Sequence, residues 1–349
     1  MKNTFFNYLI AAVFAMLVVF TSCKKNKNID DDNDTIDVYV AGRSNFYATL
    51  WKNGIAHNLT DGTRTAQARS VYVSDGYVYV AGFENNELSI SVATLWKNGT
   101  PQKLTDETNF ARANSVYISG NDVYVAGFEN NELSIGVAKL WINGIAQNLT
   151  DGTRFAEAYS VFVSGGDVYV AGWQYNEQYV NVATLWKNGV AQNLSDGTKN
   201  AEARSVFVSG SDVYVVGYER NGQYYNNVNV ATLWKNGIAK NLTDGTNHAV
   251  AQSVFVSGGI VYVAGYEDLE NYLTIAKAWV NDVVPNFADR TRQSQANSVF
   301  VSEGIVYLAG FEFNGQSNIA KLWKNGVVQE LYEANNTEAN SVFVVNNSK

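Results

Sequence analysis

Tryptophan recurs along this 349-residue chain at a nearly constant interval, and this rhythm restricts the fold more than any other feature of the sequence. Successive markers are separated by 45, 45, 45, 48, 45 and 44 residues. The markers are Trp51, Trp96, Trp141, Trp186, Trp234, Trp279 and Trp323. A period near 45 residues, built from short strands, is typical of β-propellers and not of helical solenoids. The sequence therefore predicts seven copies of one all-β unit.

Each copy contains four candidate strands, which we name first to fourth from the channel axis outward. In the copy around Trp234 the first, second and third strands fall at 205–209, 212–215 and 231–235, and the fourth begins near Asn241. The motifs Ser-Val-Phe-Val and Val-Tyr-Val are apolar on both sides of the strand, so both faces should be buried. A blade held between two neighbouring blades meets that requirement.

Turn residues support the same strand order. Asn-Gly pairs, which favour type I′ hairpins, stand between the third and fourth strands of six copies. They begin at Asn53, Asn98, Asn143, Asn188, Asn236 and Asn325. The two prolines, Pro101 and Pro285, fall in fourth strands, where an outer edge tolerates a missing amide proton.

The two ends of the repeat array are out of phase. The folded part starts at a second strand, Asp37 to Gly42, and finishes at a first strand, Ser341 to Val345. If the last strand completes the blade begun at Asp37, the ring closes and its raw edges disappear. We therefore predict an all-β, seven-bladed β-propeller over residues 37–349. It has four antiparallel strands per blade, closed by pairing of the C-terminal strand with the N-terminal three strands.

The N-terminal segment predicts export. Residues 1–22 have an early lysine and an apolar run from Tyr8 to Phe20 that is too short to span a bilayer, as in a signal peptide. Phe20-Thr21-Ser22-Cys23 resembles the lipobox of bacterial lipoproteins, which implies cleavage before Cys23 and lipidation of its thiol. An ordinary signal with an incidental cysteine is the alternative. Residues 23–36 are too polar to fold and predict a flexible tether.

The expected location is thus the cell envelope, at the outer membrane, with exposure at the cell surface left open. The lipid anchor is the only membrane contact that we expect. Cys23 is the only cysteine, so no internal disulfide can form and stability must come from the core. The formal net charge of −8 and the lack of a basic cluster argue against nucleic acid as a partner. We expect a monomer.

The repeat resembles known propeller families in its architecture. The strand order, with a tryptophan late in the third strand, resembles the WD40 repeat, but the residues that form the polar tetrad of that family are absent. The pattern Val-Ser-Gly-x-Asp-Val-Tyr-Val-Ala-Gly with Leu-Trp-Lys-Asn-Gly is similar to repeats in uncharacterised bacterial propeller lipoproteins. That resemblance covers all seven units and implies no activity.

Residues suited to catalysis are scarce. The two histidines, His57 in a fourth strand and His248 in a loop, have no cysteine or second histidine at metal-ligand spacing. No nucleophile elbow, zinc-binding helix motif or phosphate-binding loop occurs. We therefore predict no metal and no cofactor, and an enzyme is not favoured.

Residues that recur in every blade serve the geometry of the blade, so unrepeated residues are better functional candidates. One recurring set is expected to cap Thr-Asp-Gly turns: Asp61, Asp106, Asp151, Asp196, Asp244 and Asp289. A second set follows the second strands and is also assigned to structure, although a ring of acids around the axis could hold cations: Glu84, Glu129, Glu219, Glu267 and Glu312.

Variable residues gather on one predicted face, where second-to-third loops meet the entries to first strands. The loops of blades three to five gain aromatic residues: Trp173, Tyr175, Tyr179, Tyr218, Tyr224, Tyr225, Tyr266 and Tyr272. Residues just before the first strands should ring the channel mouth: Arg69, Asn114, Tyr159, Arg204, Gln252, Asn297 and Asn340. Aromatic faces beside amides and arginine suit a sugar, a peptide or a protein surface.

From these residues we select a candidate ligand-binding set of Trp173, Tyr175, Tyr218, Tyr225, Tyr266, Tyr159, Arg204 and Gln252. The favoured function is a binding or scaffold module for a glycan or protein ligand. One alternative is a propeller-type hydrolase or lyase that uses carboxylates at the channel mouth with Arg204 and Tyr159. Another is a purely structural part of an envelope assembly.

Overall fold

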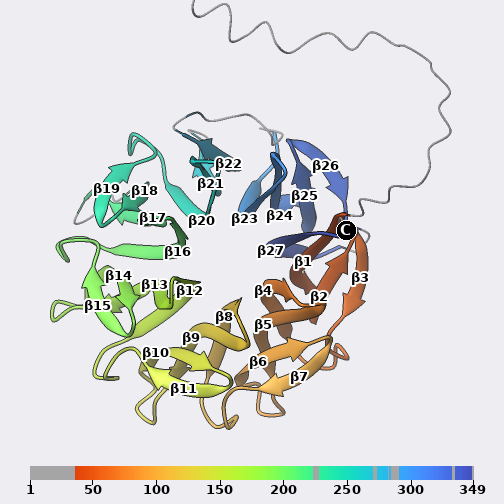
Figure 1. Cartoon of the computed structure of the whole chain (residues 1–349), viewed down its shortest axis with the longest axis horizontal. Coiled ribbons are helices and arrows are strands. Elements are labelled where there is room, and N and C mark those ends of the chain that lie inside the picture. The colour runs from red at the N-terminus through yellow and green to blue at the C-terminus, as the bar shows by residue number, and fades with distance from the viewer. Residues whose placement is uncertain are drawn as a thin grey trace, which may run out of the picture. The chain divides into compact units, whose positions relative to one another are not determined.

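The seven tryptophan-marked units form seven blades around one axis. The structure, a computed structural model, describes residues 36–222, 228–269, 273–281, 283, 291–331 and 335–347. The compact unit Ile36–Asn347 is a seven-bladed β-propeller around a central channel (Figure 1). The predicted signal peptide, Cys23 and nearly all of the tether lie outside the described residues. Among the described residues, no helix is long and apolar enough to cross a membrane.

Blades 1 to 3 follow one another along the chain, each with its strands in order from the axis outward (Figure 1). Blade 1 contains β4 (Ala66–Ser74), β5 (Tyr77–Asn85), β6 (Ser91–Lys97) and β7 (Thr100–Lys103). Blade 2 contains β8 (Ala111–Ser119), β9 (Asp122–Asn130), β10 (Gly136–Ile142) and β11 (Ile145–Asn148). Blade 3 contains β12 (Ala156–Ser164), β13 (Asp167–Tyr175), β14 (Asn181–Lys187) and β15 (Val190–Asn193).

Blades 4 to 6 repeat this order. Blade 4 contains β16 (Ala201–Ser209), β17 (Asp212–Arg220), β18 (Asn229–Lys235) and β19 (Ile238–Asn241). Blade 5 contains β20 (Ala249–Ser257), β21 (Ile260–Asp268) and β22 (Thr274–Val280). The segment expected to form its fourth strand, with Pro285, lies outside the described residues. Blade 6 contains β23 (Ser294–Ser302), β24 (Ile305–Phe313), β25 (Asn318–Lys324) and β26 (Val327–Glu330).

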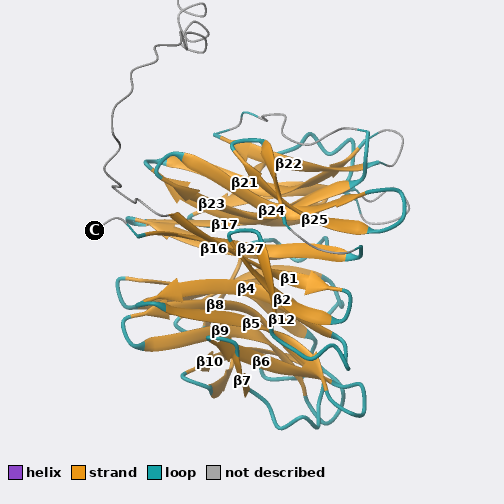
Figure 2. Ribbon diagram, turned by 90° about the vertical axis from the view of Figure 1, so that its right-hand side faces the viewer, coloured by secondary structure: helices purple, strands orange, loops and turns teal. Residues whose placement is uncertain are grey.

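Blade 7 joins the two ends of the chain, as predicted. It contains β27 (Thr337–Asn346) at the axis, followed by β1 (Ile36–Ser44), β2 (Tyr47–Lys52) and β3 (Ile55–Asn58). Strand β27 pairs with β1 along its whole length, from Ile36 opposite Asn346 to Ser44 opposite Thr337. The side view in Figure 2 shows the strands running between loops on two opposite faces.

The predicted hairpin turns are present between the third and fourth strands. Both residues of each Asn-Gly pair have positive φ, for example 51° at Asn53 and 82° at Gly54, which is the backbone of a type I′ turn. Pro101 lies in the fourth strand of blade 1, and its side chain is exposed at the outer edge. The hairpin signals in the sequence were therefore sufficient to place the outer half of the six blades that carry them.

Each pair of adjacent blades shares a buried apolar cluster, and seven such clusters complete the ring. The cluster between blades 3 and 4 shows the pattern, with Leu185 of one blade packed against Val206 and Trp234 of the next. Six of the marker tryptophans are among the largest fully buried side chains, which explains why they recur. Two of the seven clusters flank blade 7, so the closing strand is packed on both faces.

A ring of serine hydroxyls also links the blades. In each case the serine Oγ accepts a 3.2 Å hydrogen bond from a valine backbone N–H in the next blade, as Ser160 does from Val206. The other acceptors are Ser70, Ser115, Ser205, Ser253, Ser298 and Ser341. The repeated Ser-Val pair therefore joins all seven innermost strands into one hydrogen-bonded circle.

Candidate functional site

Each innermost strand carries a β-bulge at the same position. In blade 4, Ala203 pairs with Gly217 and Ser205 pairs with Val216, so Arg204 has no opposite residue. A bulge turns the extra side chain away from the regular alternation of the strand. The seven bulged residues are Arg69, Asn114, Tyr159, Arg204, Gln252, Asn297 and Asn340.

A repeated glycine in the second strand permits this bulge. An added Cβ at Gly217 would lie 1.8 Å from the backbone oxygen of Glu202, and the equivalent glycines of the other blades show 1.9 to 2.1 Å. No side chain fits at such a distance, so only glycine lets the bulged strand approach so closely. This glycine, which follows alanine in six blades and Val216 in blade 4, thus positions one side chain per blade at the axis.

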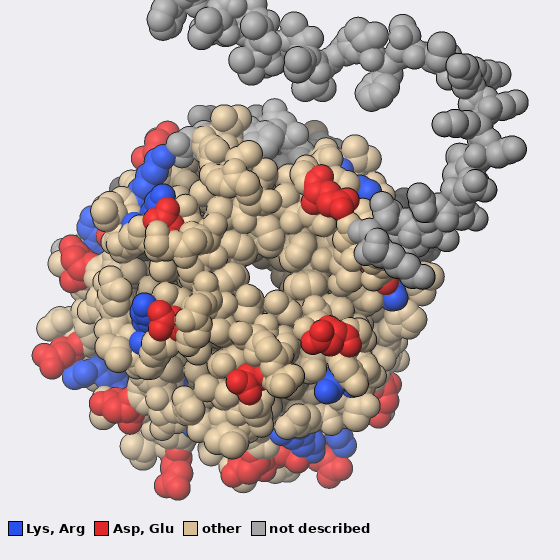
Figure 3. All heavy atoms as spheres, viewed as in Figure 1, with Lys and Arg blue, Asp and Glu red and all other residues tan. Residues whose placement is uncertain are grey.

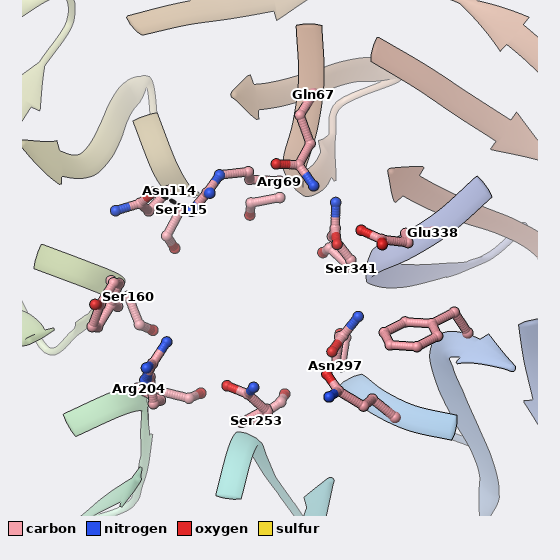
Figure 4. Close-up of a pocket in the computed structure, with 18 residues that line it drawn as sticks. Gln67, Arg69, Asn114, Ser115, Ser160, Arg204, Ser253, Asn297, Glu338 and Ser341 are labelled. Carbon is pink, nitrogen blue, oxygen red and sulfur yellow. Dashed lines mark hydrogen bonds between the residues drawn. The ribbon is translucent and has the colours of Figure 1, made fainter. Parts of the chain in front are cut away.

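These side chains surround a cavity of about 490 Å³ at one end of the channel, which we call the mouth. All seven bulged residues line it, together with the serines that follow them (Figure 4). We predicted that this set would ring the mouth from positions just before the first strands. The ring is present, but its residues lie inside the strands, because each strand starts about four residues earlier than expected. Figure 3 shows the channel as a hole at the centre of one face of the ring, bordered by uncharged residues.

The asparagines of this ring connect blades. Asn114, Asn297 and Asn340 each donate an Nδ2–H hydrogen bond of 2.8 to 2.9 Å to the backbone oxygen of an alanine in the next blade. This recurring bond assigns the asparagines a structural role. The other four positions of the ring carry Arg69, Tyr159, Arg204 and Gln252 instead, and they are the variable part of the mouth.

An ion pair stands on the side of blade 4. Arg204 Nη2 lies 2.6 Å from Glu202 Oε2, and its guanidinium carbon lies 4.6 Å from the ring centre of Tyr159. The charge of Arg204 is therefore balanced within its own strand. Burial raises the pKa of Tyr159, so its hydroxyl stays protonated and can donate a hydrogen bond.

Two further arginines gather around Phe83. The guanidinium carbon of Arg112 lies 4.6 Å from the centre of the Phe83 ring and 4.7 Å from that of Phe110, while that of Arg69 lies 5.8 Å from Phe83. Arg69 lines the cavity and donates from Nη1 to Asn114 Oδ1 at 2.9 Å. Burial, followed by the like charge of Arg112, lowers the pKa of Arg69 to about 10. Arg69 therefore remains charged at neutral pH.

The charge of Glu157 acts on both of these arginines. Its Oε1 accepts a 3.0 Å hydrogen bond from Asn114 Nδ2. Burial raises the pKa of Glu157, while attraction to Arg69 and the bond from Asn114 oppose that rise. The carboxylate is thus held in a position where its negative charge is costly.

Three glutamines form the remaining free polar surface of the cavity. Gln67, Gln252 and Gln295 line it, and their side chains make no hydrogen bond within the described part of the chain. Each amide offers both donors and an acceptor. Together with Tyr159 and Arg69, these amides leave the mouth with unused hydrogen-bonding capacity.

A closed ring of seven aromatic side chains lies three residues further along the innermost strands. Neighbouring ring centres are 4.7 to 4.9 Å apart and tilted, including the contact between Tyr72 and Phe343 that closes the circle. The members are Tyr72, Tyr117, Phe162, Phe207, Phe255, Phe300 and Phe343. The polar mouth is therefore backed by an apolar belt inside the channel.

The aromatic candidates lie elsewhere than we expected. Trp173 and Tyr218 belong to strands β13 and β17, not to loops, and are only 8% and 6% exposed. Trp173 stacks on Phe155 and donates from Nε1 to the Tyr159 hydroxyl at 3.0 Å, so it supports the mouth from behind. Tyr175 ends β13 and is partly exposed.

The remaining aromatic candidates divide in the same way. Tyr266 lies in β21 and is partly exposed, whereas Tyr179 is 74% exposed in the loop after β13. Tyr224, Tyr225 and Tyr272 lie outside the described residues. Of the predicted set, the structure brings Tyr159, Arg204 and Gln252 together at the cavity, and it adds Arg69, Arg112 and Glu157 to their surroundings.

Most of the recurring acids have structural partners. In five turns the aspartate accepts hydrogen bonds from the backbone and hydroxyl of the threonine two residues later, as Asp61 does from Thr63; Asp289 lies outside the described residues. The recurring glutamates lie in second strands, and Glu129 forms a 3.0 Å ion pair with Lys139 of the neighbouring strand. In the part of the chain that the structure describes, no group of acids, histidines or cysteines could hold a metal ion.

The histidines also stand apart from the mouth. His57 is exposed in β3, the outer strand of blade 7. His248 Nδ1 accepts a 3.1 Å hydrogen bond from the backbone N–H of Asn229, which ties the entry of blade 5 to blade 4.

Comparison with known proteins identifies the repeat but not a function. Residues 66–90, 111–135 and 249–276 match the family model of the LVIVD repeat. These segments are the inner half of blades 1, 2 and 5, so the chain is a repeat protein with a β-propeller fold. No curated protein matches the chain.

Among solved structures, the acylaminoacyl peptidase of Pyrococcus horikoshii is similar over 77% of this chain, with 16% identity and a TM-score of 0.48. The match covers 46% of that peptidase, so the chain spans about half of its length. Nothing about activity is transferred from this similarity.

Proposed function

We propose that this protein is a lipid-anchored binding module of the cell envelope, which takes a glycan at the mouth of its propeller. The single observation that carries the proposal is the unused hydrogen-bonding capacity of Gln67, Gln252 and Gln295 around one cavity of about 490 Å³. Pockets that bind small polar ligands combine a concave shape with a few convergent polar groups.

The arrangement of the mouth suits a sugar for a second reason. Sugar hydroxyls both donate and accept hydrogen bonds, and so do the amide of Gln252 and the hydroxyl of Tyr159. The blades that carry these residues are closed and packed on both sides, so the groups are held in place before a ligand arrives. Preorganised groups lose less conformational entropy on binding.

A glycan array with the purified propeller, followed by titration calorimetry on any hit, tests this function. We expect binding by the wild type and a loss of at least about tenfold in affinity for Gln252→Ala, which corresponds to one lost hydrogen-bonding group in a buried site. The matched control is Gln329→Ala, because Gln329 lies on the exposed outer strand β26. Equal affinity of both variants, or no binding to any glycan, would exclude the mouth as a sugar site.

A hydrolase or lyase is the second candidate, and Glu157 is the observation that favours it. Glu157 lies behind the cavity lining, where the lining residues Tyr159 and Arg204 act on it, and a carboxyl whose pKa is raised by burial has the properties of a general acid. Glu202, the other acid in this sector, is held in an ion pair with Arg204. Glu338, the acid among the described lining residues of the mouth, is held in a 2.9 Å ion pair with Arg43. Cleavage of a bound glycan by the wild type and not by Glu157→Gln would establish this function.

The anchor is tested separately. Cys23→Ala should remove lipidation and release the protein from the membrane fraction. The wild-type protein should incorporate a radioactive fatty acid. Release of both forms would remove the lipoprotein part of the proposal without affecting the binding site.

A further inference from the structure

The arginines around Phe83 have more positive charge than their neighbours balance. Arg69 and Arg112 lie within 5.8 Å of the same aromatic ring, and neither forms an ion pair with an acid among the described residues. The Nε atoms of both are buried and have no hydrogen-bond partner in the described chain. Two cations held together in this way attract an anion.

Arg204, unlike Arg69, has an acid that balances its positive charge. Arg204 has Glu202 at 2.6 Å, in the same innermost strand. Arg69 occupies the equivalent bulged position in blade 1, but the residue two positions before it is Gln67, which carries no charge. Within the described ranges of the chain, its side chain has one polar side-chain partner, the neutral Asn114.

Glu157 is the one acid that acts on both Arg69 and Arg112, and it compensates them poorly. The carboxylate of Glu157 accepts a hydrogen bond from Asn114, and burial disfavours its negative charge. A ligand carboxylate would supply the negative charge that the two arginines lack, on the side of the mouth formed by blades 1 and 2.

We propose that Arg69, supported by the charge of Arg112, forms a carboxylate-binding position at the channel mouth, so that the ligand is a glycan whose sugars carry carboxylates. This inference rests on the proposed function and specifies its substrate class. Arginine presents a planar fork of donors that matches a carboxylate in two-point contact. The uncharged hydroxyls of such a sugar would then face the amides of Gln252 and Gln295.

A sugar acid is favoured over an acidic peptide by the lining of the cavity. Apart from Tyr159 and Phe311, the described lining consists of serines, amides and charged side chains. A peptide is normally recognised through apolar side-chain pockets or by addition to a free strand edge. The innermost strands at the mouth are already paired, and no apolar pocket opens from it among these lining residues.

The test compares three probes on the whole chain by titration calorimetry: an oligogalacturonate, the methyl ester of the same oligomer, and a short polyglutamate. We expect the acid to bind at least about tenfold more tightly than the ester, as one charge-assisted interaction would give. Arg69→Gln should bind both sugars alike, and Arg112→Gln should reduce the preference. The matched control is Arg154→Gln, because Arg154 is exposed and only 3.7 Å from Glu177 in a loop pair.

Thermal unfolding confirms that each variant is folded, and Arg69→Lys supplies a second variant that keeps the charge while losing the fork. Equal binding of acid and ester by the wild type, with Gln252→Ala abolishing both, would overturn the carboxylate position and leave the glycan function intact. A preference that survives in Arg69→Gln would also overturn it. Binding of polyglutamate alone, or of none of the probes, would overturn both proposals.

Discussion

Ser341 Oγ accepts a hydrogen bond of 3.2 Å from the backbone N–H of Val71, although 270 residues separate the two along the chain. The same bond joins every other pair of adjacent blades, for example Ser160 to Val206. The junction between the chain ends is thus built like the six junctions formed by consecutive repeats. This equivalence can be measured.

Ser341→Ala should therefore destabilise the protein as much as Ser160→Ala. Each change leaves one partly buried backbone N–H without its acceptor, which costs about 1–2 kcal/mol. Urea unfolding of the two variants beside the wild type gives the comparison. If Ser341→Ala has no effect while Ser160→Ala destabilises, the ring is open in solution.

Gly217→Ala should disrupt blade 4 and its contribution to the mouth. The new Cβ would meet the backbone oxygen of Glu202 at 1.8 Å, so the bulge must rearrange at a cost of about 1–3 kcal/mol. The side chain of Arg204 would then no longer be turned toward the channel axis. Unfolding free energy and glycan affinity report the two effects.

Gly165→Asn is the control for that change, because the added side chain meets nothing within 4 Å and asparagine tolerates a positive φ. If Gly217→Ala has the unfolding free energy of the wild type, the close approach of the two strands at the bulge is not required for stability.

Glu157→Gln should change how stability depends on pH. The pKa of Glu157 is raised in the folded state, so the folded chain retains a proton that the unfolded chain releases near its ordinary value of 4.5. Stability from this group is fully present below that value and falls as pH rises through the folded pKa. The variant, which cannot ionise, should lack this decline.

The measurement is unfolding free energy from pH 4 to pH 8 for both proteins. The groups that face Glu157 and share its titration are Arg69 and Arg112 from blades 1 and 2, and Tyr159 and Arg204 from blades 3 and 4. Parallel curves for wild type and variant would show that the carboxyl of Glu157 titrates normally.

Tyr159→Phe should weaken the mouth in two ways. It removes the acceptor of the Trp173 Nε1–H, which costs about 1–2 kcal/mol in stability. It also removes a hydroxyl from the cavity lining, so glycan affinity should fall beyond the loss of stability. As a control, Tyr179→Phe changes only an exposed loop side chain and should alter neither quantity. An unchanged affinity in Tyr159→Phe would place the ligand away from blade 3.

Much of this fold could be read from the sequence because its determinants are local and repeated. Asn53-Gly54 specifies a hairpin by its backbone preference alone, and the apolar pattern of each strand specifies burial on two faces. The phase difference between the ends then requires β27 to complete the blade of β1. All of these predictions are confirmed.

The bulge was missed because it depends on two strands at once. In blades 1 to 5 the sequence repeats an Ala-x-Ala pattern before the Ser-Val pair, such as Ala201 and Ala203, and this pattern would have placed the start of the strand correctly. Its partner signal is the glycine that follows a small apolar residue of the second strand, as Gly217 follows Val216. Only the register between the two strands shows that Arg204 is turned toward the axis.

The aromatic candidates illustrate the opposite error. Trp173 and Tyr218 differ from the phenylalanines at the same position in blades 1 and 2, and we interpreted this difference as variation for binding. Every blade from 1 to 6 has an aromatic residue there, which by our own criterion indicates structure. Because the position follows the glycine of the second strand, its side chain packs beneath the mouth, and it is buried in all of these blades except blade 5, where Tyr266 is partly exposed.

The pairing of β27 with β1, which closes the ring in blade 7, also determines when the strands of that blade can pair during synthesis. Among the described strands, β1 emerges from the ribosome first and its inner neighbour β27 emerges last, so one long strand edge of the nascent chain stays unpaired until β27 has been translated. Such an edge can pair with any other extended chain nearby. A premature stop before Thr337 would therefore produce an open array of six complete blades and a partial seventh. Its unpaired strand edge would make this truncated protein prone to aggregation.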